Sequence, residues 1–173
     1  MIKNVEKFSR LKTKMKLLIL DVDGTLTDGK IYMSSNGELF KVFDIKDGCG
    51  IHDILPKLNI TPVIITARTS DIVLNRCKEL GIIECYQGVR DKLEKMREIA
   101  LKYDLNVNSD DVYEKIAYMG DDIIDIKCMK HCGIIACPND AVKSVKEISD
   151  FISVFNGGSG AVRDFIDNIA KDN

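Results

Sequence analysis

Short apolar runs bounded by turn residues recur along the chain, and such runs are typical of buried strands. They lie at 16–22, 61–66, 82–86, 116–119, 133–137 and 151–154. Segments with the apolar spacing of helices lie between or after them, at 70–80, 91–103, 123–131, 141–148 and 160–170. This alternation predicts an α/β fold, a doubly wound, Rossmann-like parallel sheet with helices on both faces.

Two segments depart from the alternation. Residues 30–43 alternate apolar and polar side chains around Asn36-Gly37, which predicts a β-hairpin inserted into the main fold. A helix is expected over 49–58, but Pro56 lies within it, so this helix should kink or stop early. No repeat or linker divides the chain, so we expect one domain over 16–173, preceded by an N-terminal extension at 1–15 and ending in a tail at 156–173.

Composition narrows the classes of function. A chain of 173 residues is long enough to bury a hydrophobic core without disulfides. Its net charge of −2 lacks the excess of basic residues that is typical of nucleic-acid-binding proteins. The first fifteen residues carry charges throughout, and no later apolar run has the length of a membrane span. We therefore expect a cytoplasmic protein with neither nucleic acid nor a membrane as partner.

Six cysteines are irregularly spaced, and in a domain of this size they predict reduced thiols. Cys128, His131 and Cys132 are close enough in sequence to suggest a soft-metal site. Such a site needs about four ligands, and no complementary cluster is found nearby. A structural zinc is the weaker interpretation.

Paired carboxylates follow the first predicted strand, whose apolar run leads directly into Asp21 and Asp23. The carboxyl ends of parallel strands are where open α/β sheets bind ligands. Two like charges there are costly unless a cation or a chemical task requires them; capping, the alternative, normally needs one such side chain. A second acidic cluster, Asp121, Asp122 and Asp125, follows a later strand. Mg²⁺ prefers such oxygen ligands, so the two clusters predict a shared metal site.

The sequence Asp-Val-Asp-Gly-Thr at 21–25 resembles the first motif of the haloacid dehalogenase (HAD) superfamily. Three further segments resemble its other motifs in the same order: Thr66, Lys92 and residues 120–125. The resemblance implies that the Thr66 hydroxyl bonds a phosphoryl oxygen. It also implies that the Lys92 ammonium neutralises the phosphate and the nucleophile.

The acidic residues receive their roles from the same resemblance. Asp21 would attack phosphorus to form an aspartyl-phosphate, and Asp23 would protonate the leaving oxygen and later activate water. Mg²⁺ would be held by Asp21, the main-chain carbonyl of Asp23 and Asp121, with Asp122 and Asp125 orienting its waters.

Only the predicted hairpin separates the first two motifs, so the fold is expected to lack the cap domain common in the superfamily. Within the capless group the chain resembles the family of 3-deoxy-D-manno-octulosonate 8-phosphate phosphatases and its sialic acid relatives. Segments 44–51, 87–92 and 157–163 carry the likeness. Two residues after the motif-two Thr, octulosonate enzymes tend to carry Arg and nonulosonate 9-phosphate enzymes Glu. This chain has Arg68, whose guanidinium can bind a sugar carboxylate.

The resemblance implies a small acidic sugar phosphate as substrate. Its implied contacts are Asp23, Asp44, Ile45, Lys46, Asp47, Gly48, His52, Arg68, Arg76 and Lys92. Three positions depart from the family pattern: Ala67 replaces a Gly, His52 an Arg or Lys, and Ser159 an Arg.

Three alternatives remain beside an octulosonate 8-phosphate phosphatase. One is a nonulosonate 9-phosphate phosphatase, and another is a non-catalytic accessory module of sialate activation, against which the retained motif residues argue. The third, a phosphomutase, would have to exclude water without a cap that closes.

We further expect a homotetramer, because an isolated hairpin is marginal in water and this one carries apolar side chains that a monomer leaves uncovered. These are Ile31, Met33, Leu39, Val42 and Phe43. In the family that the chain resembles, hairpins associate and the glycine-rich tail reaches a neighbouring site. Gly157, Gly158 and Gly160 would permit such an approach, and Arg163 would bring positive charge.

Overall fold

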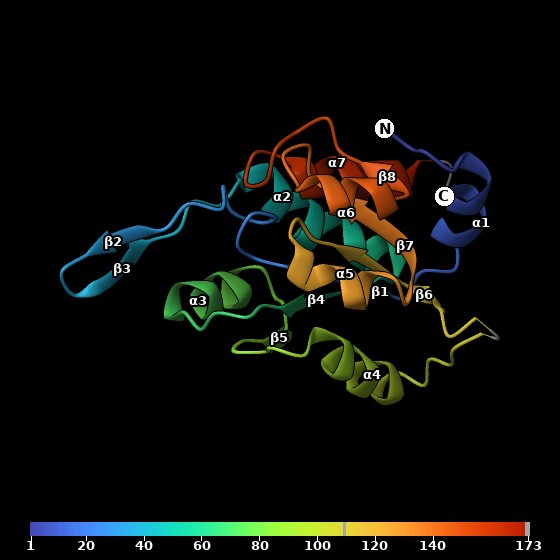
Figure 1. Cartoon of the computed structure of the whole chain (residues 1–173), viewed down its shortest axis with the longest axis horizontal. Coiled ribbons are helices and arrows are strands. Elements are labelled where there is room, and N and C mark those ends of the chain that lie inside the picture. Colours follow the sequence, from blue (N-terminus) through green and yellow to red (C-terminus); the bar gives the residue numbers. More distant parts are fainter. Residues whose placement is uncertain (109, 172–173) are drawn as a thin grey trace.

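Parallel strands form the central sheet of the computed structural model, which describes residues 1–108 and 110–171. Within these residues the sheet has six strands in the order β5-β4-β1-β6-β7-β8 (Figure 1). Their bounds are β1 (Leu17–Leu20), β4 (Thr61–Ile65), β5 (Glu84–Tyr86), β6 (Tyr113–Met119), β7 (Cys132–Cys137) and β8 (Phe151–Ile152). The predicted α/β fold with a parallel sheet is confirmed.

Helices cover both faces of this sheet. They are α1 (Val5–Lys12), α2 (Ile45–Cys49), α3 (Asp71–Glu79), α4 (Lys92–Lys102), α5 (Ile123–Met129), α6 (Lys143–Ile148) and α7 (Ala161–Ala170). Successive strand side chains point to opposite faces, so Leu18 and Leu20 pack with α1, α3 and α7, whereas Leu17 and Ile19 pack with α4, α5 and α6. Both faces of β1 are therefore buried.

The segment around Pro56 stays helical, but its hydrogen-bonding pattern changes. Helix α2 begins at Ile45, before the expected start, and a wider turn, η1 (Gly50–Ile54), and a tight 3₁₀ turn, η2 (Leu55–Leu58), follow it. Pro56 lies in the first turn of η2, where its missing N–H removes no intrahelical bond.

The N-terminal residues pack onto the domain. Phe8 of α1 is buried, and its ring centroid lies 6.1 Å from that of Phe151 and 6.2 Å from that of Phe165. The backbone N–H of Lys3 donates to the carbonyl of Asp150 at 2.7 Å. Helix α1, for which the sequence patterns gave no expectation, thus completes the core beside β8 and α7.

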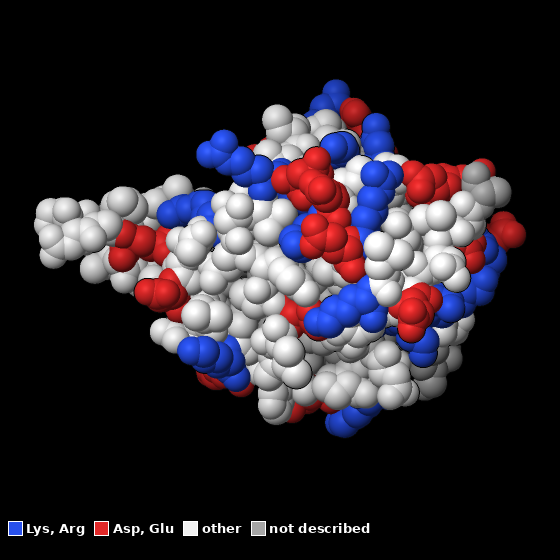
Figure 2. All heavy atoms as spheres, turned by 90° about the horizontal axis from the view of Figure 1, so that it is seen from below, with Lys and Arg blue, Asp and Glu red and all other residues white. Residues whose placement is uncertain are grey.

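The hairpin consists of β2 (Tyr32–Ser34) and β3 (Gly37–Phe40), which pair antiparallel. It projects from the body as an arm, with charged side chains near its base (Figures 1 and 2). Four of the five apolar side chains expected on its surface are exposed: Ile31, Met33, Leu39 and Val42. Phe43 is partly buried against the core, so it offers less apolar surface than the other four.

Candidate active site

The catalytic candidates meet at the carboxyl end of β1. This strand lies between β4 and β6, so the chain runs outward from it in both directions of the sheet. Such a switch point leaves a crevice at the strand ends. Asp21 is the first residue after β1, its N–H donates to the carbonyl of Met119 at 3.1 Å, and its side chain is buried. The sheet therefore holds Asp21 rigidly in the crevice.

The loop after Asp21 is a tight turn that brings β1 against the acidic end of β6. The carbonyl of Val22 accepts from the N–H groups of Thr25, Leu26 and Thr27 at 2.9–3.2 Å. Gly24 has φ +95°, and a Cβ there would lie 2.1 Å from Oδ2 of Asp121. Only glycine fits both conditions.

Thr25 supports Asp121 directly. Its hydroxyl donates to Oδ1 of Asp121 at 2.9 Å, and the Thr25 side chain is buried. The motif thus supplies a space for Asp121 at Gly24 and a hydrogen bond for it at Thr25. The sequence analysis gave Thr25 no role of its own.

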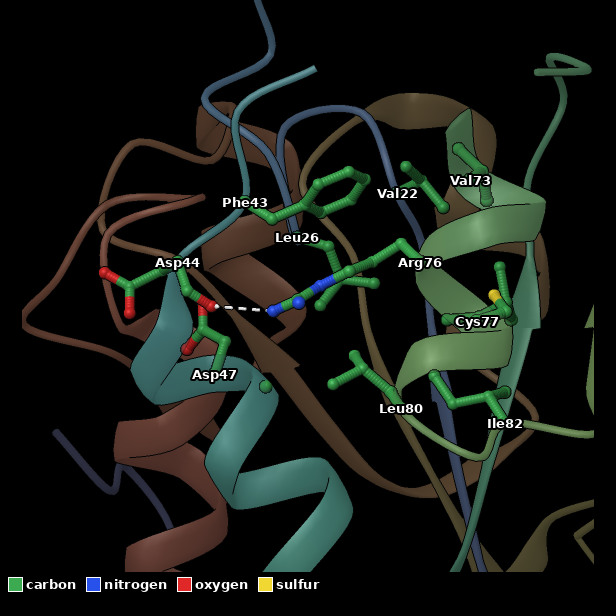
Figure 3. Close-up of a pocket in the computed structure, with 12 residues that line it drawn as sticks. Val22, Leu26, Phe43, Asp44, Asp47, Val73, Arg76, Cys77, Leu80 and Ile82 are labelled. Carbon is green, nitrogen blue, oxygen red and sulfur yellow. Dashed lines mark hydrogen bonds between the residues drawn. The ribbon is translucent and has the colours of Figure 1, made fainter. Parts of the chain in front are cut away.

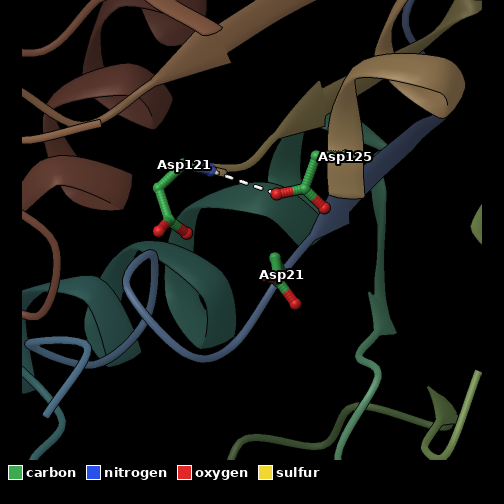
Figure 4. A group of neighbouring side chains, drawn as sticks. All are labelled: Asp21, Asp121 and Asp125. Atoms are coloured by element: carbon green, nitrogen blue, oxygen red, sulfur yellow. Dashed lines mark hydrogen bonds between the residues drawn. The ribbon is translucent and has the colours of Figure 1, made fainter. Parts of the chain in front are cut away.

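Three carboxylates from two strand ends converge (Figure 4). Oxygens of Asp21, Asp121 and Asp125 all lie within 4.8 Å of one another. Desolvation, followed by the charge of Asp125, raises the pKa of Asp21 to about 6. Desolvation also raises the pKa of Asp121 to about 7, with Thr25 opposing and Asp21 adding to the shift. A hard cation held by oxygens of Asp21 and Asp121 would offset the cost of burying these two negative charges, so the donor set fits Mg²⁺.

Lys92 joins two of these carboxylates. Its Nζ lies 2.8 Å from Oδ1 of Asp21 and 2.7 Å from Oδ1 of Asp125, and the side chain is buried. Burial acts to lower the pKa of Lys92, but Asp21 and Asp125 outweigh it and raise that pKa. Lys92 therefore stays charged beside the candidate nucleophile.

The carboxylate of Asp125 is buried, and both of its oxygens accept hydrogen bonds. Besides Lys92, the Tyr118 hydroxyl donates to its Oδ1 at 2.7 Å, and the backbone N–H groups of Asp121 and Asp122 donate to its Oδ2 at 3.2 and 3.3 Å. Asp122 caps α5, with Asp125 completing a capping box. Asp125 thus fixes the Asp121 backbone and Lys92 together; Tyr118 is a supporting residue that the sequence analysis missed.

Thr66 lies on the same edge of the sheet. Leu20 of β1 pairs with Ile64 of β4, and Thr66 directly follows β4. Its N–H donates to the carbonyl of Tyr86 at 3.0 Å, and it is buried. The parallel register therefore places Thr66 level with the loop after Asp21.

Asp23 has a partner that the sequence analysis did not find. Oδ1 of Asp23 accepts from Nζ of Lys41, which comes from the base of the hairpin. Lys41 also lies 3.1 Å from Oε1 of Glu38, to which Arg68 donates at 2.9 Å. Nη1 of Arg68 is buried without a hydrogen-bond partner among the described residues. No local sequence signal marks Lys41, because its burial depends on how the hairpin folds back.

The other predicted sugar contacts fall into exposed and buried groups. Ile45, Lys46 and His52 are exposed, and Nδ1 of His52 lies 2.8 Å from Oδ1 of Asp53. Asp44 caps α2 by accepting from the N–H of Lys46 at 2.6 Å.

Asp47 and Gly48 are buried and face other elements. Oδ1 of Asp47 accepts from the N–H of Arg163 at 2.7 Å in the first turn of α7. Desolvation raises the pKa of Asp47 to about 6, although the backbone hydrogen bonds that its carboxylate accepts act to lower that pKa. A Cβ at Gly48 would lie 2.5 Å from the guanidinium of Arg76. The geometry therefore gives both residues packing and capping roles.

Arg76 closes an apolar pocket behind the catalytic loop (Figure 3). Its Nη2 donates to the carbonyl of Asp44 at 3.5 Å, its guanidinium carbon lies 5.7 Å from the ring centroid of Phe43, and Nη1 pairs with Glu79 at 2.8 Å. The free volume of the pocket is about 10 Å³, about enough for one water molecule. This pocket is too small for a sugar, and in it Arg76 anchors the chain around Asp44 to α3; Arg76 also lines an open surface pocket with Ile45, Gly48 and His52.

The tail glycines contact their own chain. A Cβ at Gly157 would lie 1.9 Å from the carbonyl oxygen of Gly24, and the N–H of Gly158 donates to the carbonyl of Thr25 at 3.1 Å. Arg163 pairs with Asp167 at 2.8 Å within α7. In this chain the start of the tail supports the catalytic loop; residues 172–173 of the predicted tail lie outside the described part.

The alternative soft-metal site does not assemble. His131 Nδ1 lies 2.9 Å from the carbonyl oxygen of Asp111, whereas Cys128 and Cys132 are buried with their sulfurs 3.5 and 3.4 Å from that of Met96. Within the described residues all six cysteines are free, and the one cluster with metal-ligand spacing is the carboxylate group.

The comparisons with known proteins agree with this geometry. No family model matches the chain. Over 153 residues the chain is 40% identical to the 3-deoxy-D-manno-octulosonate 8-phosphate phosphatase KdsC of Salmonella typhi, covering 88% of the chain and 78% of the relative. The enzyme of the same name from Yersinia pestis is 36% identical over 155 residues, covering 90% and 79%.

Solved structures are similar over nearly the whole chain. The octulosonate 8-phosphate phosphatase of Moraxella catarrhalis, crystallised with magnesium, phosphate and 3-deoxy-D-manno-octulosonate (KDO), has a TM-score of 0.89 at 33% identity, covering 97% of this chain and 92% of that one. The cobalt-bound enzyme of Haemophilus influenzae has a TM-score of 0.84 at 32% identity, covering 92% and 89%. A Legionella pneumophila protein described as a HAD superfamily hydrolase of subfamily III A has a TM-score of 0.86 at 33% identity, covering 94% and 86%.

The sheet order, the acidic strand ends and these neighbours define the protein as a hydrolase of the HAD superfamily. More narrowly, the chain belongs to the KdsC family of 3-deoxy-D-manno-octulosonate 8-phosphate phosphatases. The resemblance inferred from the motifs is thereby confirmed, and so is the assignment as a phosphatase.

Proposed function

We propose that this protein is a Mg²⁺-dependent phosphatase that releases inorganic phosphate from KDO 8-phosphate. The observation that carries the proposal is the convergence of Asp21, Lys92, Asp121 and Asp125 at the end of β1. The relatives named for this substrate and the presence of Arg68 favour an octulosonate over a nonulosonate.

The first half of the reaction transfers the phosphoryl group to the enzyme. A carboxylate oxygen of Asp21 attacks phosphorus, the bond from phosphorus to the sugar oxygen breaks, and Asp23 donates a proton to that oxygen. Phosphate monoesters react extremely slowly unaided, so charge on the transferred group must be neutralised. Lys92 supplies a buried positive charge 2.8 Å from Asp21, and the Thr66 hydroxyl lies on the same edge of the sheet.

The second half regenerates the enzyme. Asp23 takes a proton from water, the water oxygen attacks phosphorus, and the bond to Asp21 breaks to release inorganic phosphate. Asp21, the main-chain carbonyl of Asp23 and Asp121 would hold Mg²⁺, which supplies further neutralisation of the transferred group when bound. Asp122 and Asp125 would orient the groups around that ion.

Arg68 would recognise the sugar carboxylate. Its guanidinium already binds one carboxylate, that of Glu38, and its Nη1 is buried without a partner among the described residues. A substrate carboxylate that reaches Nη1 would remove the penalty of an unsatisfied buried donor. Ile45, Lys46 and His52 remain proposed contacts at the exposed rim.

The nucleophile can be tested by Asp21→Asn, because an amide is a poor nucleophile and a weaker metal ligand. We expect the folded variant to release no measurable phosphate from KDO 8-phosphate. Asp111→Asn, which changes an exposed carboxylate just before the start of β6, at the opposite end of that strand from Asp121, should retain most activity and serves as the control. Substantial turnover by folded Asp21→Asn protein would refute the mechanism.

We also propose a homotetramer in the cytoplasm. The exposed apolar side chains of the hairpin support assembly through it, because closed symmetric pairing would cover them. The six free cysteines suit a reducing compartment. Light scattering tests the assembly, and a monomer in solution would exclude it. In the described residues no helix has the length and apolarity needed to cross a membrane.

A further inference from the structure

Lys41 is a buried lysine that the reaction described above leaves without a role. Its side chain is only 2% exposed, although it comes from an arm that projects from the domain. Its Nζ contacts Oδ1 of Asp23 and lies 3.1 Å from Oε1 of Glu38. An ammonium removed from water is costly unless it is paired, and here two carboxylates pair it.

The other end of this arrangement is fixed to the main sheet. Glu38 accepts from Nη2 of Arg68 at 2.9 Å and from the hydroxyl of Ser70, both in the segment between β4 and α3. Desolvation opposes ionisation of Glu38, but Ser70, Lys41 and Arg68 outweigh it and lower its pKa. Glu38 is therefore ionised, and its carboxylate holds the Lys41 ammonium next to Asp23 in the catalytic loop.

We propose that Lys41 is the positioning residue for Asp23, so that the hairpin sets the orientation of the acid–base carboxyl. The proposal rests on the role assigned to Asp23 under the proposed function. With Oδ1 held by Lys41, Oδ2 is the oxygen that can exchange a proton with the leaving group or with water. Without that bond the carboxyl of Asp23, which is 24% exposed, can rotate away from the line of attack.

The inference predicts a dependence on the leaving group. A sugar alkoxide needs a proton from Asp23 as it departs, whereas the phenolate of p-nitrophenyl phosphate does not. The ratio kcat/KM reports the steps up to departure of the leaving group, so it omits hydrolysis of the aspartyl-phosphate. A defect confined to Asp23 should therefore lower kcat/KM for a sugar phosphate and spare that for the aryl phosphate.

The test compares Lys41→Met with the wild-type enzyme on KDO 8-phosphate, glucose 6-phosphate and p-nitrophenyl phosphate. General acid catalysis contributes about 10²–10⁴-fold, so we expect a loss of about 10- to 100-fold on the sugar phosphates and less than about threefold on the aryl phosphate. Lys41→Arg should restore most of the loss. Lys30→Met, whose side chain is 74% exposed on the same hairpin, is the matched control and should change neither rate.

A double mutant tests whether Lys41 acts through Asp23. In an Asp23→Asn background, adding Lys41→Met should change kcat/KM on the sugar phosphates by less than about twofold, because the interaction is already lost. A crystal structure of Lys41→Met should show the Asp23 carboxyl displaced or in several rotamers.

Equal losses on both leaving groups, or an unmoved Asp23 carboxyl, would overturn the proposal and assign Lys41 to the phosphate or to hairpin folding. Failure of the proposed function itself is a different result, since it would appear as wild-type protein inactive on all three esters or as unchanged turnover by Asp21→Asn.

Discussion

The buried contacts of Lys92 allow a quantitative prediction about Lys92→Met. Methionine has a similar length but no charge, so the variant leaves the carboxylates of Asp21 and Asp125 without the ammonium that lies 2.8 and 2.7 Å from them. Removing one partner from a buried ion pair costs about 3–5 kcal/mol in the free energy of unfolding. For a domain of this size that corresponds to a fall in Tm of about 6–20 °C.

The loss in the free energy of unfolding caused by Lys92→Met should depend on pH. The pKa of Asp21 is already about 6 in the folded protein, raised by desolvation and Asp125 and lowered by Lys92. Without Lys92 this folded pKa rises further above the unfolded value, so the folded variant binds more protons than the unfolded chain between those values. Stability of the variant then falls as pH rises through that window. The difference from wild type should be larger at pH 8 than at pH 5.5.

Urea denaturation in EDTA at the two pH values measures both effects. Lys95→Met is the control on the same helix, because Lys95 forms a partly exposed pair with Glu98, and its loss should change stability by less than about 0.5 kcal/mol. A loss for Lys92→Met as small as that of the control at pH 8, or one independent of pH, would refute the buried-network reasoning.

Three further outcomes are expected. EDTA should abolish phosphate release and Mg²⁺ restore it, because the converging oxygens form a hard-cation site; full restoration by zinc alone would contradict this. Arg68→Ala should raise KM for KDO 8-phosphate at least about tenfold more than for neutral glucose 6-phosphate, while equal changes would show that Arg68 serves the phosphate or the fold. Asp47→Ala should lower the free energy of unfolding by about 1–3 kcal/mol in thermal or urea melts, and Asp47→Asn by less than about 1, since an amide oxygen still accepts from α7; equal losses would exclude the capping role.

The sequence was informative wherever function depends on strand ends. Apolar runs locate the strands, and the parallel sheet brings the residues that follow β1 and β6 to one edge, so the acidic clusters at Asp21 and Asp121 could be grouped from the sequence; Thr66 was assigned through the resemblance to the superfamily. Local chemistry also identified the hairpin from Asn36-Gly37, although the two turn residues are Ser35 and Asn36 and Gly37 begins β3.

Other features depend on contacts between distant segments, and local patterns do not contain them. The burial of Lys41 requires the base of the hairpin to fold over Asp23, and the capping role of Asp47 requires α7 to arrive from the other end of the chain. The contact of the Arg76 guanidinium with the ring of Phe43 likewise joins segments that are far apart in the sequence. No local sequence pattern predicted the docking of α1, because the rings that stabilise it, Phe151 and Phe165, lie far from it in the sequence.

The docking of α1 also has a consequence for the order of events during synthesis. Helix α1 is translated long before β8 and α7, against which Phe8 packs. In that interval the apolar face of α1 has no native surface to cover it. The nascent chain therefore keeps this aromatic segment exposed until β8 and α7 have been made.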